Sequence, residues 1–327
     1  MSGRGDWFRS NDSTARTRLM MAGAFVGSLL LLGTSTVFSW PVAVGNAPIT
    51  VEEERALAFD APTGSCLTWT PPEGADMKRV DCAQPHLFEV TSNVDISADY
   101  PANSPVPEVS RWHDIAKQKC TPGATAYLGG TLDPFGRYTI SALKPTDPQW
   151  QDGDRKLRCG LQRMAPSGGL LASSGTAAHQ DQSNVHDPGT CLALLDNQKI
   201  GDPIPCDRSH AYEIVGNVDL GPAFPGDYPT KDAQADKANE LCAAVTNEYT
   251  GGADLAAKGL TPYPDTLEQE SWAAGSRKVD CKVGAKLPDG SGLAPITNSV
   301  RGSGTEGSPA PPVPTEPTTT SGTPAGG

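Results

Sequence analysis

The sequence lacks the signatures that identify several classes of protein. It contains no G-x-S-x-G nucleophile motif, no Walker phosphate loop and no H-E-x-x-H metalloprotease motif. Clustered Lys and Arg are missing and the formal net charge is −12, which argues against binding to the phosphates of a nucleic acid. The cysteines form no C-x-x-C pair, so a zinc centre is not indicated. We therefore expect no catalytic residue, no metal, no cofactor and no nucleic-acid partner.

Charged residues are also missing from Leu19 to Val51. The uncharged stretch is long enough for a helix across a ~30 Å hydrocarbon core, and we predict a transmembrane helix over residues 19–44 after a cytosolic stub of residues 1–18. Arg outnumbers the acidic residues before this helix, which places the N-terminus in the cytoplasm and the rest of the chain outside. The alternative is a cleaved signal peptide ending at Ala47. The predicted location is the cell membrane, with a single span.

No cysteine is left over from a repeated pattern. The eight cysteines form two matching sets of four: Cys66, Cys82, Cys120 and Cys159, then Cys191, Cys206, Cys242 and Cys281. Their spacings are 16, 38 and 39 residues in the first set and 15, 36 and 39 in the second. An even, repeated complement is typical of a disulfide scaffold in an oxidising compartment, which agrees with an extracytoplasmic location.

Four cysteines allow three pairings in each set. The first two flank a short connection that contains Pro and Gly and suits a hairpin. The third is expected on a helix, and the fourth on a strand that this helix covers. We predict four disulfides: Cys66–Cys82, Cys120–Cys159, Cys191–Cys206 and Cys242–Cys281. Closing a loop of ~15 residues would be worth about 3 kcal/mol in the chain-entropy model.

The residues around the cysteines repeat in the same order, so the chain contains a duplication. His, Glu, Asn, Trp, Gly and Arg recur at offsets of 122 to 125 residues. We call residues 58–163 the first copy and residues 187–286 the second copy. The Gly-, Ser-, Ala- and Gln-rich residues 164–186 predict a flexible linker, and the Pro-, Thr-, Gly- and Ser-rich residues 287–327 predict a disordered tail.

Hydrophobic periodicity predicts the same elements in both copies. Alternate residues from His86 to Ile96 are mostly apolar, as are those from His210 to Leu220, which is typical of half-buried strands. Apolar residues recur every three or four positions from Ala238 to Tyr249 and predict a helix. The equivalent helix around Cys120 should break or kink early, at Pro122 and Gly123. The predicted class is α+β: two tandem small disulfide-braced domains, each an antiparallel sheet with one helix, behind an N-terminal transmembrane helix.

Both copies follow one order of motifs. In the first copy the residues are Gly64, Cys66, Cys82, Pro85, His86, Glu89, Val90, Cys120, Trp150, Gly153, Arg155 and Cys159. In the second copy they are Gly189, Cys191, Cys206, His210, Glu213, Cys242, Trp272, Gly275, Arg277 and Cys281. Ser209 replaces the proline, and Ser276 replaces the acidic residue that Asp154 supplies. This order resembles the actinobacterial septum-formation domain family, which implies outward-facing, membrane-anchored proteins with a role around division or the growing envelope, and no known reaction.

His86 and His210 are the first candidates for chemistry, because His titrates near neutrality and ligates metals. Their place on the apolar face of a strand favours core-edge histidines that are satisfied by hydrogen bonds. Glu89 and Glu213 follow three residues later, which would place them on the opposite face of the strand. A joint His/Glu metal site is therefore not expected.

Arg155 and Arg277 are the other candidate site residues. Each follows a Gly turn that Trp150 or Trp272 would hold by packing. The plain interpretation is a structural turn with an exposed Arg, and the alternative is an Arg that binds a carboxylate or a phosphate.

These observations favour a non-catalytic, membrane-anchored extracytoplasmic protein that binds division or cell-wall proteins, or serves as their scaffold. A cell-wall-acting enzyme and an envelope sensor of a small ligand are the alternatives. An enzyme is expected to keep a polar constellation in one copy beyond the shared framework, whereas a binding module is expected to share only its scaffold.

Overall fold

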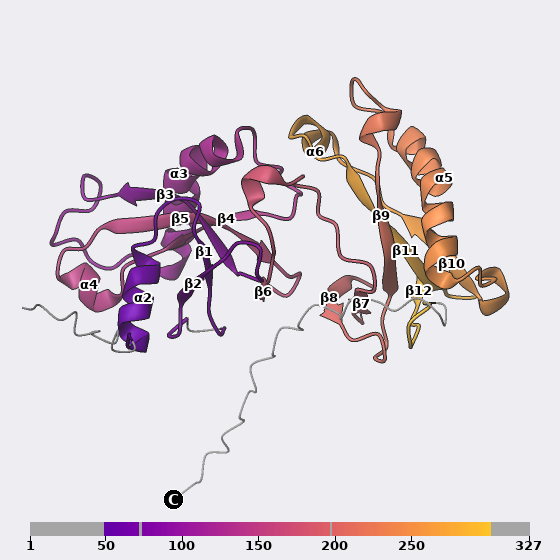
Figure 1. Cartoon of the computed structure of the whole chain (residues 1–327), viewed down its shortest axis with the longest axis horizontal. Helices are drawn as coiled ribbons and strands as arrows, with labels where there is room; N and C mark the ends of the chain where they lie inside the picture. Colours follow the sequence, from indigo (N-terminus) through magenta and orange to yellow (C-terminus); the bar gives the residue numbers. More distant parts are fainter. Residues whose placement is uncertain (1–48, 72–73, 197, 302–327) are drawn as a thin grey trace, which may run out of the picture. The chain divides into compact units, whose positions relative to one another are not determined.

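The computed structural model describes residues 49–71, 74–196 and 198–301 (Figure 1). The predicted stub and transmembrane helix, residues 1–18 and 19–44, lie outside the described residues. Within the described ranges no helix is both long and apolar enough to cross a membrane. The described residues from Val51 onward belong to one compact unit, which includes both copies.

The first copy is built on an antiparallel sheet with the strand order β2-β1-β3-β5-β4. Its strands are β1 (Cys66–Thr68), β2 (Lys78–Val80), β3 (Phe88–Asp95), β4 (Thr139–Leu143) and β5 (Lys156–Met164), and the short β6 (Leu170–Leu171) pairs with β5. One long helix, α3 (Val109–Leu128), lies along the sheet (Figure 1). The short helices are α2 (Val51–Phe59), α4 (Asp147–Gln151) and the 3-10 turn η1 (Ala177–His179).

The second sheet has the equivalent order, β8-β7-β9-β11-β10. Its strands are β7 (Cys191–Leu194), β8 (Ile200–Ile204), β9 (Tyr212–Asp219), β10 (Leu260–Pro264), β11 (Lys278–Lys286) and β12 (Leu293–Ala294), the last pairing with β11. The long helix is α5 (Lys231–Thr250), followed later by α6 (Gln269–Ala273); the 3-10 turns are η2 (Gly221–Ala223) and η3 (Ala256–Lys258). Two antiparallel sheets, each with one long helix, confirm the predicted class of each copy.

Helix α3 continues past Pro122 and Gly123 to Leu128, so the early break that was one of the two predicted outcomes does not occur. Cys120, two residues before the proline, ties the helix to β5. Gly123 then allows a close approach to β3, because a Cβ at this position would lie 2.1 Å from Ser92 Oγ. Tertiary packing thus outweighs the loss of one helical hydrogen bond at the proline.

All four predicted disulfides are confirmed: Cys66–Cys82, Cys120–Cys159, Cys191–Cys206 and Cys242–Cys281. In each copy the first bond joins the strand that opens the sheet to the turn before the central strand. The second bond joins the long helix to β5 or β11. Every cysteine of the chain is paired.

The prediction that residues 164–186 are a flexible linker is wrong. Strand β6 continues the first sheet, Ser173 forms a β-bridge with His86, and Ala177, Ser183 and Val185 are buried. The first residues of the predicted tail also pair with the second sheet. Strand β12 pairs with β11, and Ile296 forms a β-bridge with His210. Backbone pairing needs no particular side chains, so composition does not reveal it. Residues 302–327 of the tail lie outside the described residues.

Candidate functional site

His86 and Glu89 lie next to each other in the interior, which corrects the prediction that the strand holds them apart. The distance between His86 Nε2 and Glu89 Oε2 is 4.0 Å, and both residues are buried. Strand β3 begins only at Phe88, after a bend at Leu87. The alternation of side chains therefore does not extend back to the histidine.

The carboxylate of Glu89 ties the segment after β6 to the core of the first copy. It accepts hydrogen bonds from the Tyr127 hydroxyl and, at 2.8 Å, from the backbone N–H of Ala177. Burial, and then the hydrogen bond to Glu89, raises the pKa of Tyr127 above its ordinary value. Glu89 thus binds helix α3 and the segment after β6 together.

Glu213 has the same role in the second copy. It accepts from the Tyr249 hydroxyl, the Ser299 hydroxyl and the backbone N–H of Val300, each at 2.6 Å. Burial, with the hydrogen bond to Glu213, raises the pKa of Tyr249 to about 12. The buried glutamates are therefore satisfied by internal donors, as buried carboxylates must be.

The two histidines share one orientation. Nδ1 lies 2.9 Å from the Gln84 carbonyl in His86 and 2.7 Å from the Arg208 carbonyl in His210. A carbonyl only accepts, so we assign the proton to Nδ1. Nε2 of His86 lies 3.5 Å from Ser173 Oγ, whereas Nε2 of His210 is buried and has no hydrogen-bond partner among the described residues.

Arg155 is buried, with 3% of its surface exposed, so the prediction of an exposed Arg is wrong in the first copy. Its guanidinium stacks on Trp150 at 3.8 Å from the ring centroid. The group donates to five backbone carbonyls, those of Tyr100 (2.9 Å), Trp150 (2.6 Å), Asp154 (2.8 Å), Pro101 (3.1 Å) and Ala102 (2.8 Å). Arg155 therefore closes a loop onto the turn, and its donors are engaged within the protein.

Arg277 stacks on Trp272 at 4.0 Å and is half-buried. It donates to the carbonyls of Trp272 at 2.6 Å and Ser276 at 2.7 Å. The Trp-x-x-Gly-x-Arg motif is thus an internal lock in both copies, made by cation–π stacking and carbonyl bonds.

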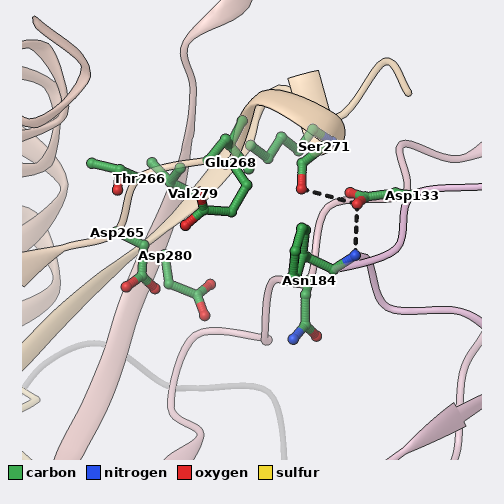
Figure 2. Close-up of a pocket in the computed structure, with 11 residues that line it drawn as sticks. Asp133, Asn184, Asp265, Thr266, Glu268, Ser271, Val279 and Asp280 are labelled. Carbon is green, nitrogen blue, oxygen red and sulfur yellow. Dashed lines mark hydrogen bonds between the residues drawn. The ribbon is translucent and has the colours of Figure 1, made fainter. Parts of the chain in front are cut away.

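A pocket of about 140 Å³ lies where residues of both copies meet (Figure 2). On one side, the buried carboxylate of Asp133 accepts from Ser271 Oγ at 2.9 Å, from Ser276 Oγ at 2.6 Å and from the N–H of Phe135 at 2.9 Å. Ser276 stands where the first copy has Asp154, and a carboxylate there would oppose Asp133. The serine hydroxyl at position 276, where the first copy has an acidic residue, therefore suits this contact.

Residues 180–186, part of the predicted linker, bind both copies beside this pocket. Arg137 of the first copy donates to the Ser183 carbonyl at 3.0 Å and to the Val185 carbonyl at 2.8 Å. Ser183 Oγ accepts the N–H groups of Arg277 at 3.1 Å and Lys278 at 2.9 Å, in the second copy. The segment is a structured polar link rather than a tether.

Acidic residues line the opposite side of the pocket, where Figure 2 shows Asp265 close to Asp280. Asp280 lies 2.9 Å from His186 Nδ1, and Asp265 forms an ion pair with Lys282. Burial raises the pKa of the Asp265 carboxyl, against the lowering effect of Lys282. Sequence reasoning missed this pocket, and its one signal was the acidic-to-Ser change at position 276.

Two groups of three possible metal ligands occur within the described ranges. They are Cys66, His86 and Glu89, and Cys191, Cys206 and Glu213, with the ligand atoms of each group within 4.8 Å of one another. Because all three cysteines are in disulfides, the sulfurs are not thiolate ligands in this state.

The septum-formation family model matches residues 63–281 of the chain. Two relatives, both described as uncharacterized membrane proteins of Mycobacterium tuberculosis, from strains CDC 1551 and H37Rv, are each 34% identical over 323 aligned residues. The alignments cover 90% of this chain and 69% of each relative. No solved structure matches the chain significantly.

Proposed function

Because this chain belongs to the septum-formation family, we propose that it is a membrane-anchored extracytoplasmic scaffold. It acts at the septum or the growing envelope by binding division or cell-wall proteins, and it has no catalytic activity of its own. The family match and the membrane-protein relatives support an association with the septum or envelope.

One observation carries the proposal: the motif residues that match the family are used inside the fold. Glu89 and Glu213 hold the segments that follow β6 and β12, and Arg155 and Arg277 lock a turn onto a tryptophan. The shared motif residues therefore stabilise the fold of each copy. Partners would be recognised by the loops and surfaces that vary between the copies. This is the pattern expected of a binding module.

Localisation tests the cellular role. The full chain with a C-terminal epitope tag, labelled from outside the cell, should concentrate at septa or zones of envelope growth. A matched control ends at residue 57 and carries the same tag, so it reports where the anchor alone goes. Cross-linking in the same cells should recover division or cell-wall proteins with the full chain and not with the control. Identical distributions for the two chains would reject the proposal.

Topology is tested separately. A protease added to spheroplasts should digest both copies, because the Arg bias before the uncharged stretch places them outside. Protection of both copies from the protease would contradict the extracytoplasmic assignment.

A second candidate, hydrolysis of cell-wall material, draws on one contact in the first copy. Ser173 Oγ lies 3.5 Å from His86 Nε2, and Ile296 takes the serine's place in the second copy. The full chain should release no cell-wall fragments. Release that stops in both the Ser173→Ala and His86→Gln variants would replace the scaffold proposal with the enzyme.

A further inference from the structure

We propose that each copy holds a latent zinc site, which forms when the disulfide Cys66–Cys82 or Cys191–Cys206 is reduced. In the first copy the two thiolates would join His86 and Glu89 around one ion. In the second copy they would join His210 and Glu213. The inference is independent of the proposed scaffold function.

The first copy already brings three of the four ligands together. The ligand atoms of Cys66, His86 and Glu89 lie within 4.8 Å of one another, and all three residues are buried. Cys82 is bonded directly to Cys66, so its sulfur is the neighbouring fourth donor. Two sulfurs, an imidazole nitrogen and a carboxylate oxygen are all ligand types that zinc accepts in a four-coordinate site.

The second copy has the equivalent four residues, and here the three that lie close together are the two cysteines and the glutamate. The ligand atoms of Cys191, Cys206 and Glu213 lie within 4.8 Å of one another. The remaining ligand, His210, is fully buried, and within the described part of the chain its Nε2 has no hydrogen-bond partner. A buried nitrogen without a partner is costly and calls for an explanation. A metal ion would satisfy it.

The groups around these ligands are arranged as metal sites require. Nδ1 of each histidine faces a backbone carbonyl, at 2.9 Å for His86 and 2.7 Å for His210. This leaves the lone pair of the neutral ring on Nε2. Each glutamate is oriented by a tyrosine hydroxyl and a backbone N–H. Such outer contacts fix the orientation of metal ligands.

The chemistry needs a dithiol reductant, small or protein-borne. It supplies two electrons and two protons, the cysteine S–S bond breaks to two thiols, and the reductant leaves as its own disulfide. Zn²⁺ then displaces the two thiol protons and binds the thiolates. Cys82 and Cys206 are half-buried and open to attack, whereas Cys120, Cys159, Cys242 and Cys281 are buried.

The test compares zinc binding by the oxidised and reduced full chain, purified in detergent. A phosphine reduces the chain without air, alkylation of an aliquot maps the free thiols, and Zn²⁺ is titrated after the phosphine is removed. We expect free thiols only at the cysteines of Cys66–Cys82 and Cys191–Cys206, two zinc ions per reduced chain and none per oxidised chain. Co²⁺ in place of zinc should give the visible bands of a tetrahedral thiolate site.

Single-copy variants use the other copy as an internal reference. Glu89→Gln and His86→Gln should each lower the stoichiometry from two to one, with Glu213→Gln doing the same for the second copy. His113→Gln changes an exposed histidine of α3 and should leave two ions bound. Near-ultraviolet circular dichroism checks that the tryptophan environments persist.

Several results would overturn the proposal. They are equal binding by the oxidised and reduced chains, two ions bound to the Glu89→Gln or His86→Gln variant, loss of both ions in a single-copy variant, and a reduced chain that unfolds and does not regain its fold with zinc.

Discussion

The long helix contacts the sheet at the same point in both copies. The smaller residue of the contact is on the helix in the first copy and on the sheet in the second. In the first copy Gly123 of α3 faces Ser92 of β3, and in the second Val245 of α5 faces Gly216 of β9. A Cβ on Gly216 would lie 2.2 Å from Val245 Cγ1. The close approach of helix and sheet is therefore kept in both copies, although neither residue of the contact is shared.

The Trp–Arg lock differs in the opposite way, because its residues are shared but only some of its contacts are. Arg155 reaches the carbonyls of Tyr100, Pro101 and Ala102 in addition to its own turn. Among the described contacts of Arg277, the carbonyl acceptors lie within its own turn. A shared motif can thus carry unequal structural weight in two copies of one fold.

The largest effect should come from breaking the lock. Arg155→Ala removes a buried cation and leaves several carbonyls without donors, so the free energy of unfolding should fall by about 3–5 kcal/mol. Arg277→Ala should cost only about 1 kcal/mol, because its group is partly exposed and bonds to its own turn. Denaturant titrations of both variants test the comparison. Equal losses would show that the two locks are equivalent.

The contact between the copies should come next. Ser276→Asp places a second carboxylate against buried Asp133, and we expect a loss of about 3 kcal/mol in the free energy of unfolding. The matched control is Asp154→Ser, at the equivalent position of the first copy, which should cost less than about 1 kcal/mol. Thermal unfolding by calorimetry measures both. If Ser276→Asp unfolds with the same free energy as the wild type, a hydroxyl is not needed at this contact.

The exchanged helix–sheet contact gives a third, smaller effect. Gly123→Val should destabilise the first copy by about 1–3 kcal/mol, because the new side chain meets Ser92. Adding Ser92→Gly recreates the pair found in the second copy and should restore most of the loss. A double variant no more stable than the single one would show that the two contacts are not interchangeable.

The smallest effect concerns the Glu–Tyr bond. Tyr249→Phe should cost about 1 kcal/mol at neutral pH. The folded-state pKa of Tyr249, about 12, lies above the unfolded value of about 10. The stability that the hydroxyl contributes is therefore complete below pH ~10 and is lost as the pH rises towards ~12. The difference between wild type and variant should shrink over that range, as measured by unfolding at several pH values.

Much of the scaffold could be predicted because it follows from spacing and periodicity. The disulfide pairs follow from the expected hairpin and the helix over the sheet, and α5 follows from its apolar stripe. The extent of α3 could not be predicted, because the contact of Gly123 with Ser92 is visible only in three dimensions.

The sites were predicted less well, for local reasons. A bend at Leu87 brings His86 to Glu89, and no periodic pattern signals one bend. Arg155 is buried by a loop some 50 residues earlier in the chain. The equal interval from Cys82 to His86 and from Cys206 to His210 indicates a shared local structure, but not which side chains it brings together.

The exchange of volumes between helix and sheet also constrains how the copies diverged. A valine facing a serine at this point is too crowded, whereas a glycine facing a glycine leaves a gap and weakens the helix by only about 1 kcal/mol. A lineage that changes one residue at a time therefore passes through the loose pair more readily than through the crowded one.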